Sequence, residues 1–316
     1  MKNKKILILG GTGALGKTIT RRYHKNNKII IFSRDEHKHV DMKRTFSDVI
    51  FQIGDVKDKD SILQALNEYS PDVVINAAAL KHVPVCEYNP YESVKTNIIG
   101  HKNLIDCINV SNHQIKTLIF ISTDKACKPI NVYGMCKAIS EKLYIDFAKK
   151  QNKIKVVLCR YGNVLESTGS AISFFKKLLE SGKDTLPITV STMTRFFITL
   201  KESVDLIEWA YTHKKSHGNI VVPKLIALRM VDVAKELAKS YGVANVQLNF
   251  IGIRPGEKLH EEMVSFEESF RTIKHSKYLV ITNNIINTEG SAFSSDSVVL
   301  DSSEVRAFLT EKGVIR

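Results

Sequence analysis

The feature that most constrains this chain is a short apolar strand that runs directly into a glycine-rich turn. Residues 5–10 read KILILG, and residues 10–16 read GGTGALG before a helical pattern begins. Glycines at this spacing allow a tight turn, let backbone amides approach a pyrophosphate, and let the next helix pack close to the strand. A helix N-terminus also attracts anions, so the turn predicts a dinucleotide site. Its predicted cofactor-binding residues are Gly10, Thr12, Gly13, Ala14, Leu15 and Gly16.

Apolar runs alternate with amphipathic segments through the first half of the chain. The strand-like runs are residues 5–10, 28–32, 49–53, 72–79, 117–123 and 155–160. The helix-like segments are residues 14–25, 35–47, 58–69, 90–110 and 134–151. Nearly continuous apolar runs are typical of strands that are covered on both faces, and the alternation indicates parallel βαβ units. We therefore expect an α/β fold with a Rossmann-like, doubly wound parallel sheet over residues 1–165.

The pattern changes after about residue 165. Helix-like segments at 170–182, 200–213 and 229–241 are separated by shorter strand candidates at 188–190, 219–222 and 246–251. Residues 166–316 are expected to form mainly a smaller α/β substrate-binding lobe, with possible segments that return to the Rossmann core. The Asn- and Ser-rich stretch 283–297 predicts a loop or a flexible arm.

The end of the second predicted strand bears on the choice of cofactor. An NAD-selective site usually has Asp or Glu there to bind the ribose hydroxyls, whereas this strand ends in Ser33 and Arg34. A hydroxyl and a guanidinium suit a 2′-phosphate, which favours NADP over NAD. Asp35 and Glu36 follow at once and could turn inward, so NAD stays open. Later strand ends add the predicted cofactor contacts Asp55, Val56, Ala77, Ala78 and Ala79.

Two proton-transfer pairs occur in the stretch STDKACKPINVYGMCK, residues 122–137. Tyr133 and Lys137 lie one helical turn apart, so both face the same side of a helix. A lysine beside a phenol is expected to lower the pKa of the tyrosine, which could then accept an alcohol proton as a hydride leaves for a nicotinamide. The adjacent Asp124 and Lys125 form a second acid and base, which could also be an exposed charge pair in a loop.

Seven segments between residues 10 and 263 carry a family resemblance. They read GGTGALG, FSRDE, NAAALKHVP, STDKACKPINVYGMCK, RYGNVLESTGS, MTRFFIT and IRPGEKLHEEM. In these segments the chain resembles the extended short-chain dehydrogenases/reductases, specifically the inverting UDP-N-acetylglucosamine 4,6-dehydratases of surface-polysaccharide biosynthesis. Met135 and Cys136 depart from the small or hydroxylated residues that are more usual between this tyrosine and lysine.

The resemblance implies a separate role for each pair. Tyr133 and Lys137 would act in oxidation of the sugar at C4 and would contact the cofactor. Lys125 would then remove the acidified C5 proton, while a protonated Asp124 would help to expel the C6 hydroxyl as water. The hydride would return to C6, so tightly bound NADP is regenerated, and reprotonation from the opposite face would invert C5. The product implied is UDP-2-acetamido-2,6-dideoxy-β-L-arabino-hexos-4-ulose.

The resemblance also implies substrate contacts, for which structural roles are the alternative. Lys81 and His82 would lie near the sugar or the cofactor, unless they form only a solvated turn. Thr123 would contact the sugar, Asn163 the nucleotide sugar, and Glu257 the uridine ribose. Arg195 and Arg254 are fixed cations that suit phosphate, although Arg195 could instead pair structurally with an acid.

Composition excludes few partners. Five cysteines without a ligand-like spacing indicate free thiols in a reducing cytoplasm, and no apolar run of eighteen residues predicts a membrane span. The net charge of +13 is spread along the chain, so nucleic acid is not expected. His37 and His39 lack ligand partners, and no metal is expected. The resemblance implies a homo-oligomer.

Three functions compete at this point. A UDP-sugar 4-epimerase or a 4-keto reductase of the same fold would need only Tyr133 and Lys137. A non-catalytic NADP-binding regulator would need neither pair. The presence of Asp124 and Lys125 favours the dehydratase.

Overall fold

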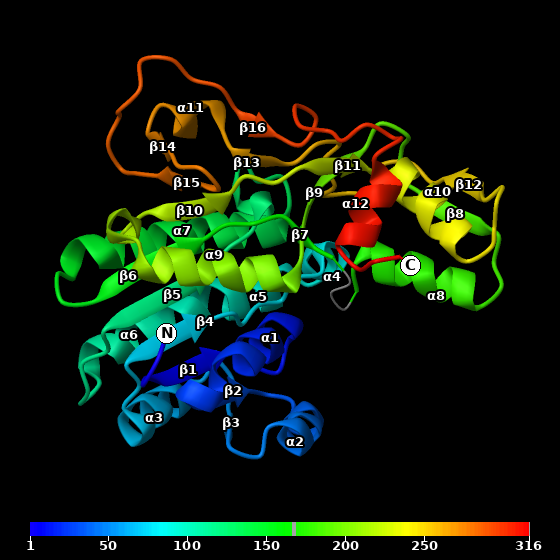
Figure 1. Ribbon diagram of the computed structural model, residues 1–316. Helices are drawn as coiled ribbons and strands as arrows, with labels where there is room; N and C mark the ends of the chain where they lie inside the picture. The colour runs from blue at the N-terminus through cyan, green and yellow to red at the C-terminus, as the bar shows by residue number, and fades with distance from the viewer. Residues whose placement is uncertain (166–168, 316) are drawn as a thin grey trace.

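A nine-stranded sheet forms the centre of the computed structural model, which describes residues 1–165 and 169–315 (Figure 1). The segment RYGNVLESTGS and the predicted boundary between residues 165 and 166 therefore lie partly outside the described residues. In order across the sheet, the strands are β14 (Thr272–Lys274), β15 (Tyr278–Ile281), β10 (Ile220–Pro223), β6 (Lys155–Cys159), β5 (Thr117–Ile121), β4 (Val73–Asn76), β1 (Lys5–Leu9), β2 (Lys28–Ser33) and β3 (Ile50–Ile53).

The strands from β10 to β3 run parallel, as the apolar runs predict, and β15 and β14 extend the sheet in antiparallel fashion. Every residue of β4 and β5 is buried, because helices cover both faces. One face carries α1 (Ala14–Tyr23) and α9 (Leu200–Thr212). The other carries α3 (Lys59–Tyr69), α6 (Gly100–Val110) and α7 (Val132–Lys150). The predicted doubly wound fold is confirmed.

The strand order reverses at β1, which pairs with β2 on one side and with β4 on the other. Ligands of open α/β sheets bind at such a switch point, beyond the carboxyl ends of the strands. Gly10 ends β1 there with φ +72°, and a Cβ on Gly10 would lie 2.8 Å from the Cα of Ala78 after β4. Only glycine allows the two strand ends to approach so closely.

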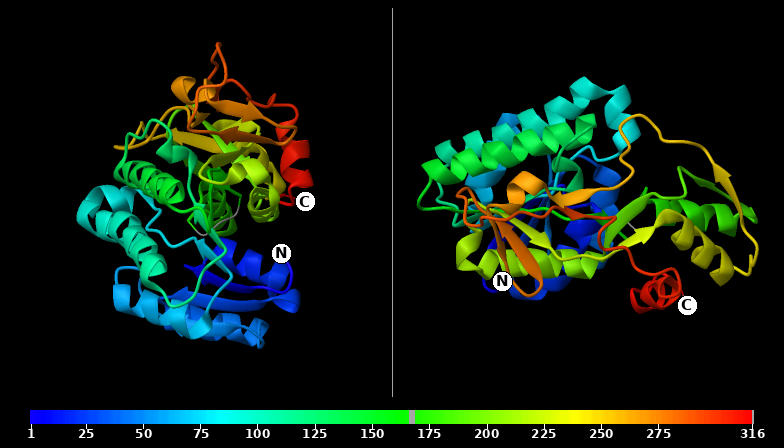
Figure 2. Two further views of the ribbon diagram at one scale, coloured as in Figure 1. Left: turned by 90° about the vertical axis from the view of Figure 1, so that its left-hand side faces the viewer. Right: turned by 90° about the horizontal axis from the view of Figure 1, so that it is seen from above.

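A second apolar core lies in a smaller lobe beside the sheet (Figure 2). Its helices are α8 (Ala171–Glu180), α10 (Met230–Ser240) and α12 (Val305–Glu311). Its strands pair as β8 (Thr185–Ile188) with β12 (Gln247–Phe250). Two small sheets join the parts: β7 (Asn163–Val164), β9 (Thr194–Ile198) and β11 (Ala227–Arg229) form one, and β13 (Glu262–Val264) and β16 (Phe293–Ser294) form the other.

Short elements complete the described chain. They are η1 (His24–Asn26), α2 (Glu36–Thr45), α4 (Val83–Tyr88), α5 (Pro90–Val94), the π-helical turn η2 (Lys95–Ile99), η3 (Asp124–Ala126), η4 (Lys214–Ser216) and α11 (Phe266–Ser269). In the described part of the chain, no helix has the length and apolar character needed to cross a membrane.

Three element predictions differ from the structure. The strand expected at 188–190 ends at Ile188, because the extended run begins earlier, at Thr185. The helix expected over 90–110 contains the π-helical turn between α5 and α6. The stretch 283–297, expected to be a loop or a flexible arm, includes the strand β16. Its Asn287 side chain donates hydrogen bonds to the carbonyls of Ser269 and Thr272, which fixes the stretch against the rest of the protein.

Candidate active site

A cleft of about 810 Å³ opens between the carboxyl ends of the sheet strands and the smaller lobe. All of the predicted cofactor- and substrate-binding residues line it. Of the four predicted catalytic residues, Lys125, Tyr133 and Lys137 line the cleft, whereas Asp124 is fully buried just behind its wall. Residues that are far apart in the sequence therefore meet at one site.

The turn after β1 presents an open helix N-terminus to the cleft. Gly13 is the N-cap of α1, and it has no side chain to satisfy the free backbone amides of the first helical turn. The first turn of α1 also has no acidic residue. Backbone amides that lack a side-chain cap and face a cleft fit a pyrophosphate.

The end of β2 is organised around the hydroxyl of Ser33. Ser33 Oγ lies 3.0 Å from Thr12 Oγ1 and 2.6 Å from Nε2 of the buried His39. Arg34 is half exposed beside it, with Nη1 3.5 Å from Asp55 Oδ2. This corner therefore combines a fixed hydroxyl with a half-exposed cation at the cleft wall.

Asp35 is occupied by its own helix. Its carboxylate accepts a hydrogen bond from Lys38 N as the N-cap of α2, and it lies 2.7 Å from Lys38 Nζ. Both interactions engage the acid that could otherwise have received the ribose hydroxyls. Lys38, which we did not predict as a site residue, adds a second cation to this corner of the cleft.

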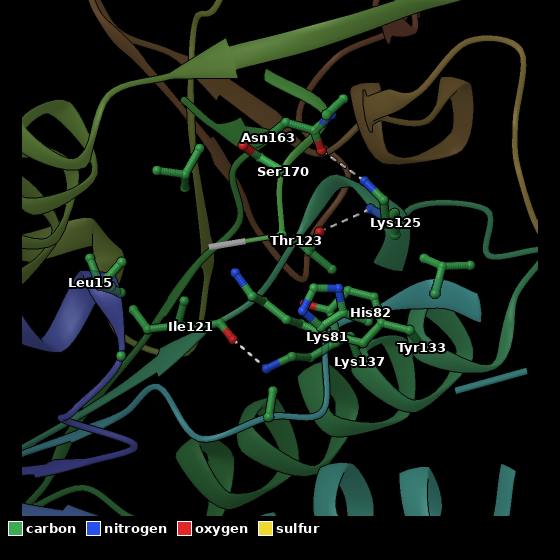
Figure 3. A pocket seen from close by; sticks show the side chains of 18 of the residues that line it. Leu15, Lys81, His82, Ile121, Thr123, Lys125, Tyr133, Lys137, Asn163 and Ser170 are labelled. Carbon is green, nitrogen blue, oxygen red and sulfur yellow. Dashed lines mark hydrogen bonds between the residues drawn. The ribbon is translucent and has the colours of Figure 1, made fainter. Parts of the chain in front are cut away.

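Tyr133 and Lys137 lie on the first turns of α7, whose N-cap Asn131 accepts a hydrogen bond from Gly134 N at 2.7 Å. Lys137 Nζ donates to the carbonyl of Ile121 at 2.7 Å (Figure 3) and lies 4.5 Å from the centre of the Phe120 ring. Burial of this ammonium lowers the pKa of Lys137 to about 7.

The predicted lowering of the Tyr133 pKa is wrong for this arrangement. Burial and, to a lesser extent, the charge of Asp124 raise the pKa of Tyr133. The Lys137 ammonium is directed at the Ile121 carbonyl, where it does not offset these effects. The four-residue spacing predicted that Tyr133 and Lys137 lie on one side of the helix, but it could not predict the direction in which the Lys137 ammonium points.

Lys125 is held by three oxygen atoms at the cleft wall. Its Nζ lies 3.1 Å from Asp124 Oδ1, 3.1 Å from Asn163 Oδ1 (Figure 3) and 3.5 Å from Glu261 Oε1. Burial by itself lowers the pKa of Lys125, but the charges of Asp124 and Glu261 outweigh burial and raise it. The pair is thus not an exposed charge pair in a loop.

Asp124, the first residue of η3, is fixed by hydrogen bonds at its carboxylate and at its backbone amide. Thr123 Oγ1 donates to Asp124 Oδ1 at 2.9 Å, and Asp124 N donates to the carbonyl of Tyr161 at 3.0 Å. Asp124 Oδ2 is buried and has no hydrogen-bond partner among the described residues. Since an unpaired buried oxygen is costly, this atom fits a proton or a substrate hydroxyl.

The two arginines predicted to bind phosphate differ in their exposure and in how many of their donors are engaged within the protein. Arg254 and Glu257 form an ion pair, with Arg254 Nε 2.9 Å from Glu257 Oε2, and Arg254 stays exposed at the cleft. Arg195 is 7% exposed and donates to the carbonyls of Thr194, Leu259 and Lys258. These partners are carbonyls rather than the acid that we considered, and they leave few donors for a phosphate.

The remaining predicted residues lie at the mouth of the cleft. Lys81 and His82 are exposed after β4, and the His82 ring packs so closely on Gly169 that a Cβ on Gly169 would lie 2.1 Å from the ring.

Among residues 1–165 and 169–315, no group of three or more His, Cys, Asp or Glu is arranged to hold a metal ion.

Sequence reasoning missed Glu261 and an apolar wall of the cleft. Glu261 belongs to the segment IRPGEKLHEEM, but nothing in that segment distinguishes it from Glu262. The apolar wall is formed by Phe174, Ile188, Met230 and Ile251 of the smaller lobe. Their spacing predicts helices and strands but not a shared cleft.

Residues 6–283 match the family described as "Polysaccharide biosynthesis protein". The chain belongs to this family. An inverting UDP-N-acetylglucosamine 4,6-dehydratase of Campylobacter jejuni serotype O:2 is 44% identical over 90% of this chain and 85% of its own length. A UDP-glucose 4-epimerase of Rickettsia felis is 41% identical over 84% and 79%.

Relatives at similar identity to this chain are thus named for two different activities. Among solved structures, Pen from Bacillus thuringiensis superimposes with a TM-score of 0.90 at 28% identity, covering 100% of this chain and 99% of that one. This likeness over the whole length supports the Rossmann-like architecture. Choosing between the two activities depends on the site itself.

Proposed function

We propose that this enzyme is a UDP-N-acetylglucosamine 4,6-dehydratase that inverts C5, a lyase of nucleotide-sugar biosynthesis. The product would be UDP-2-acetamido-2,6-dideoxy-β-L-arabino-hexos-4-ulose. The observation that carries the proposal is the Lys125 ammonium at the cleft wall, 3.1 Å from the buried carboxylate of Asp124 and near Tyr133 and Lys137. The inverting relatives from Campylobacter support the same activity.

The cleft fits a nicotinamide dinucleotide, and we infer NADP rather than NAD. The uncapped N-terminus of α1 would hold the pyrophosphate, and Ser33, Arg34 and Lys38 would hold a 2′-phosphate. Engagement of Asp35 by α2 supports this choice. When bound, the cofactor would accept a hydride from C4 of the sugar and return it to C6.

Tyr133 would accept the proton of the C4 hydroxyl. A phenolate is needed for this step, and the raised pKa of Tyr133 opposes it. Lys137, with a pKa of about 7, can be a cation at neutral pH. We infer that its ammonium turns from the Ile121 carbonyl toward Tyr133 when the phenolate forms, since an adjacent cation favours that form.

The Asp124–Lys125 ion pair would perform the elimination after one internal proton transfer. Movement of a proton from Lys125 Nζ to Asp124 Oδ1, along the 3.1 Å contact, gives a free amine and a carboxylic acid. The amine then takes the C5 proton, and the acid protonates the departing C6 hydroxyl as water. Both groups thus start from the ion pair that the structure shows.

The proposed substrate contacts differ in whether their side chains are already engaged by other groups of the protein. Arg254, Glu257, Asn163, Lys81 and His82 line the cleft, which supports the proposal that they contact the nucleotide sugar. Thr123 already donates to Asp124, so we assign it to that carboxylate as well as to the sugar. Arg195 is assigned mainly to the carbonyls of residues 258 and 259.

We further propose a cytoplasmic homo-oligomer, with a cofactor-binding part over residues 1–165 and a mainly substrate-binding part over 166–316. All five cysteines are free and buried, which suits a reducing compartment. β10, β14 and β15 would be the segments of the second part that return to the sheet.

The second candidate is a 4-epimerase, as the Rickettsia relatives are named. Tyr133 and Lys137 would suffice for it, and Asp124 and Lys125 would have no task. The test is to incubate the protein with UDP-N-acetylglucosamine and NADP⁺ and to identify the product by NMR. A 4-keto-6-deoxy sugar supports the dehydratase, whereas a C4 epimer, or no turnover with any UDP-hexose, would refute it.

A further inference from the structure

Glu261 places a second carboxylate at the proposed reaction centre, beside that of Asp124. It is 2% exposed, lines the cleft, and has Oε1 3.5 Å from Lys125 Nζ. Its Oε2 is buried without a hydrogen-bond partner among the described residues and lies 3.8 Å from Lys258 Nζ. A buried carboxylate with one unpaired oxygen carries a desolvation cost that demands an explanation.

The backbone around Glu261 is fixed by contacts on both sides. Glu261 N donates to Ser295 Oγ at 2.9 Å, and Ser295 N donates to the Glu261 carbonyl at 2.8 Å. Arg195 holds the preceding carbonyls of Lys258 and Leu259 at 2.8 and 3.1 Å. These contacts keep the Glu261 side chain directed at Lys125, so the 3.5 Å approach is built into the fold.

The three oxygen atoms around Lys125 match the needs of an ammonium. A protonated lysine has three N–H donors, and Asp124, Asn163 and Glu261 supply three acceptors. A free amine has only two donors, so one acceptor must be given up when Lys125 loses a proton. The contact with Glu261 is the longest of the three.

The charges that face Lys125 come from several elements. Asp124 of η3 and Glu261 ahead of β13 are acidic and favour the ammonium, whereas Arg195 of β9 disfavours it. Lys258 faces Glu261 and partly offsets its charge. Of the two acids at Lys125, Asp124 has a task of its own in the proposed elimination, whereas Glu261 has none and acts on that step only through its charge.

We propose that Glu261 is a positioning residue that holds the Lys125 ammonium at the cleft wall and thereby sets the pH range in which the Asp124–Lys125 pair keeps the one proton that the elimination needs. This inference rests on the proposed function, because it assigns Lys125 as the base at C5. The raised pKa of Lys125 is consistent with it. Glu261 does not touch the reacting atoms in this role; it acts through the lysine.

The test is the pH profile of deuterium incorporation at C5 in Glu261→Gln, with UDP-N-acetylglucosamine and NADP⁺ in deuterated buffer. Glutamine keeps the size of the side chain and removes its charge. An opposite charge at this range moves a pKa by about one to three units, so the acidic limb should move down by about one pH unit or more. Glu261→Asp, which draws the charge away from Lys125, should give a smaller shift in the same direction.

Glu262→Gln is the matched control, because Glu262 is adjacent but pairs with Lys128 at 3.4 Å. Its profile should follow the wild type. NADP⁺ titration by fluorescence should give the same affinity in all variants. If Glu261→Gln does not fold, the pH profile of deuterium incorporation by Glu261→Asp tests the inference in its place.

An acidic limb that stays in place in both Glu261 variants would overturn the inference. Loss of C5 exchange at every pH with intact NADP⁺ binding would also overturn it, since Glu261 would then transfer the proton itself. Wild-type enzyme that incorporates no deuterium at C5 would instead refute the proposed function, which keeps the two failures distinguishable.

Discussion

At the scale of single residues, the unusual group is the ammonium of Lys137. Lys137 is 2% exposed, and among the described residues its ammonium donates one hydrogen bond, to the Ile121 carbonyl, and lies over the face of the Phe120 ring. These partners replace little of the water that a lysine loses on burial. Its pKa therefore falls from 10.5 to about 7.

This shift predicts a specific dependence of stability on pH. Between pH 7 and 10.5 the unfolded chain binds a proton that folded Lys137 does not, so its contribution to stability falls as pH drops through this window. Lys137→Met removes that contribution. The free energy of unfolding of the variant minus that of the wild type should be larger at pH 7 than at pH 10, by about 2–4 kcal/mol.

Urea denaturation at the two pH values measures this difference. Lys142→Met is the control, because Lys142 is exposed on the same helix and its ammonium is solvated in both states. A Lys137→Met difference that is equal at pH 7 and pH 10 would show that the buried lysine does not titrate in this window.

At the residue level, the sequence could predict that side chains at or after the ends of parallel strands share one cleft. Ser33 ends β2, and the glycine turn and Arg34 directly follow β1 and β2. Parallel strands of one sheet end at the same edge, so their shared cleft was foreseeable. Glu261 was not, because its approach to Lys125 joins positions 136 residues apart in the chain through contacts of Ser295 and Arg195.

At the scale of elements, the β2–α2 connection determines the cofactor preference that we propose. The N-cap role of Asp35 in α2 turns its carboxylate toward Lys38, while Arg34 stays half exposed at the cleft. One backbone turn thus removes an acid from the ribose position and presents a cation in its place. The predicted result is a site for a 2′-phosphate.

Arg34→Ala should weaken NADP⁺ binding about tenfold or more and change NAD⁺ binding much less, since a charge-assisted hydrogen bond contributes about 1.5–3 kcal/mol. Isothermal titration with each dinucleotide measures both constants. Arg44→Ala, which removes an exposed cation paired with Asp41 at 3.3 Å, should leave them unchanged. Equal losses for the two dinucleotides would contradict the NADP assignment.

Strands with several consecutive apolar residues were predictable from the sequence, whereas strands of two or three residues were not. The strands of the parallel sheet have apolar runs and were found, with ends that differ by a few residues. β13 and β16 have three and two residues and form only because they pair with each other across the fold. β9 is fully buried, but its run TRFFI contains an arginine, which the structure satisfies with carbonyls.

At the scale of the whole molecule, one buried arginine connects the sheet to the segment that carries Glu261. Arg160 follows β6 and is 1% exposed. Its guanidinium lies 2.6 Å from Glu141 of α7 and 2.7 Å from Glu268 of α11, and it donates to the carbonyl of Met263 at 2.9 Å. The segment over 261–268 is thereby fixed against α7.

Arg160→Leu should lower the free energy of unfolding by about 3–5 kcal/mol, because two carboxylates would stay buried without their cation. Chemical denaturation at pH 7 measures this change. The control is Lys150→Ala, which removes an exposed ion pair with Asp146 and should cost about 0.5 kcal/mol or less. Comparable losses in the two variants would mean that the Arg160 network does not connect the parts as described.

If the Asp124–Lys125 pair removes water across C5 and C6, the C5 proton is taken up by Lys125 and replaced from the solvent, so deuterium at C5 reports on this step. Wild-type enzyme and Lys125→Ala are each incubated with UDP-N-acetylglucosamine and NADP⁺ in deuterated water and followed by NMR. The wild type should give a 4-keto-6-deoxy product with deuterium at C5 and inverted configuration, and Lys125→Ala should lose C5 exchange while it still binds NADP⁺. Retained configuration at C5 would refute the proposed inversion, and normal turnover of Lys125→Ala would show that the Asp124–Lys125 pair does not perform the elimination.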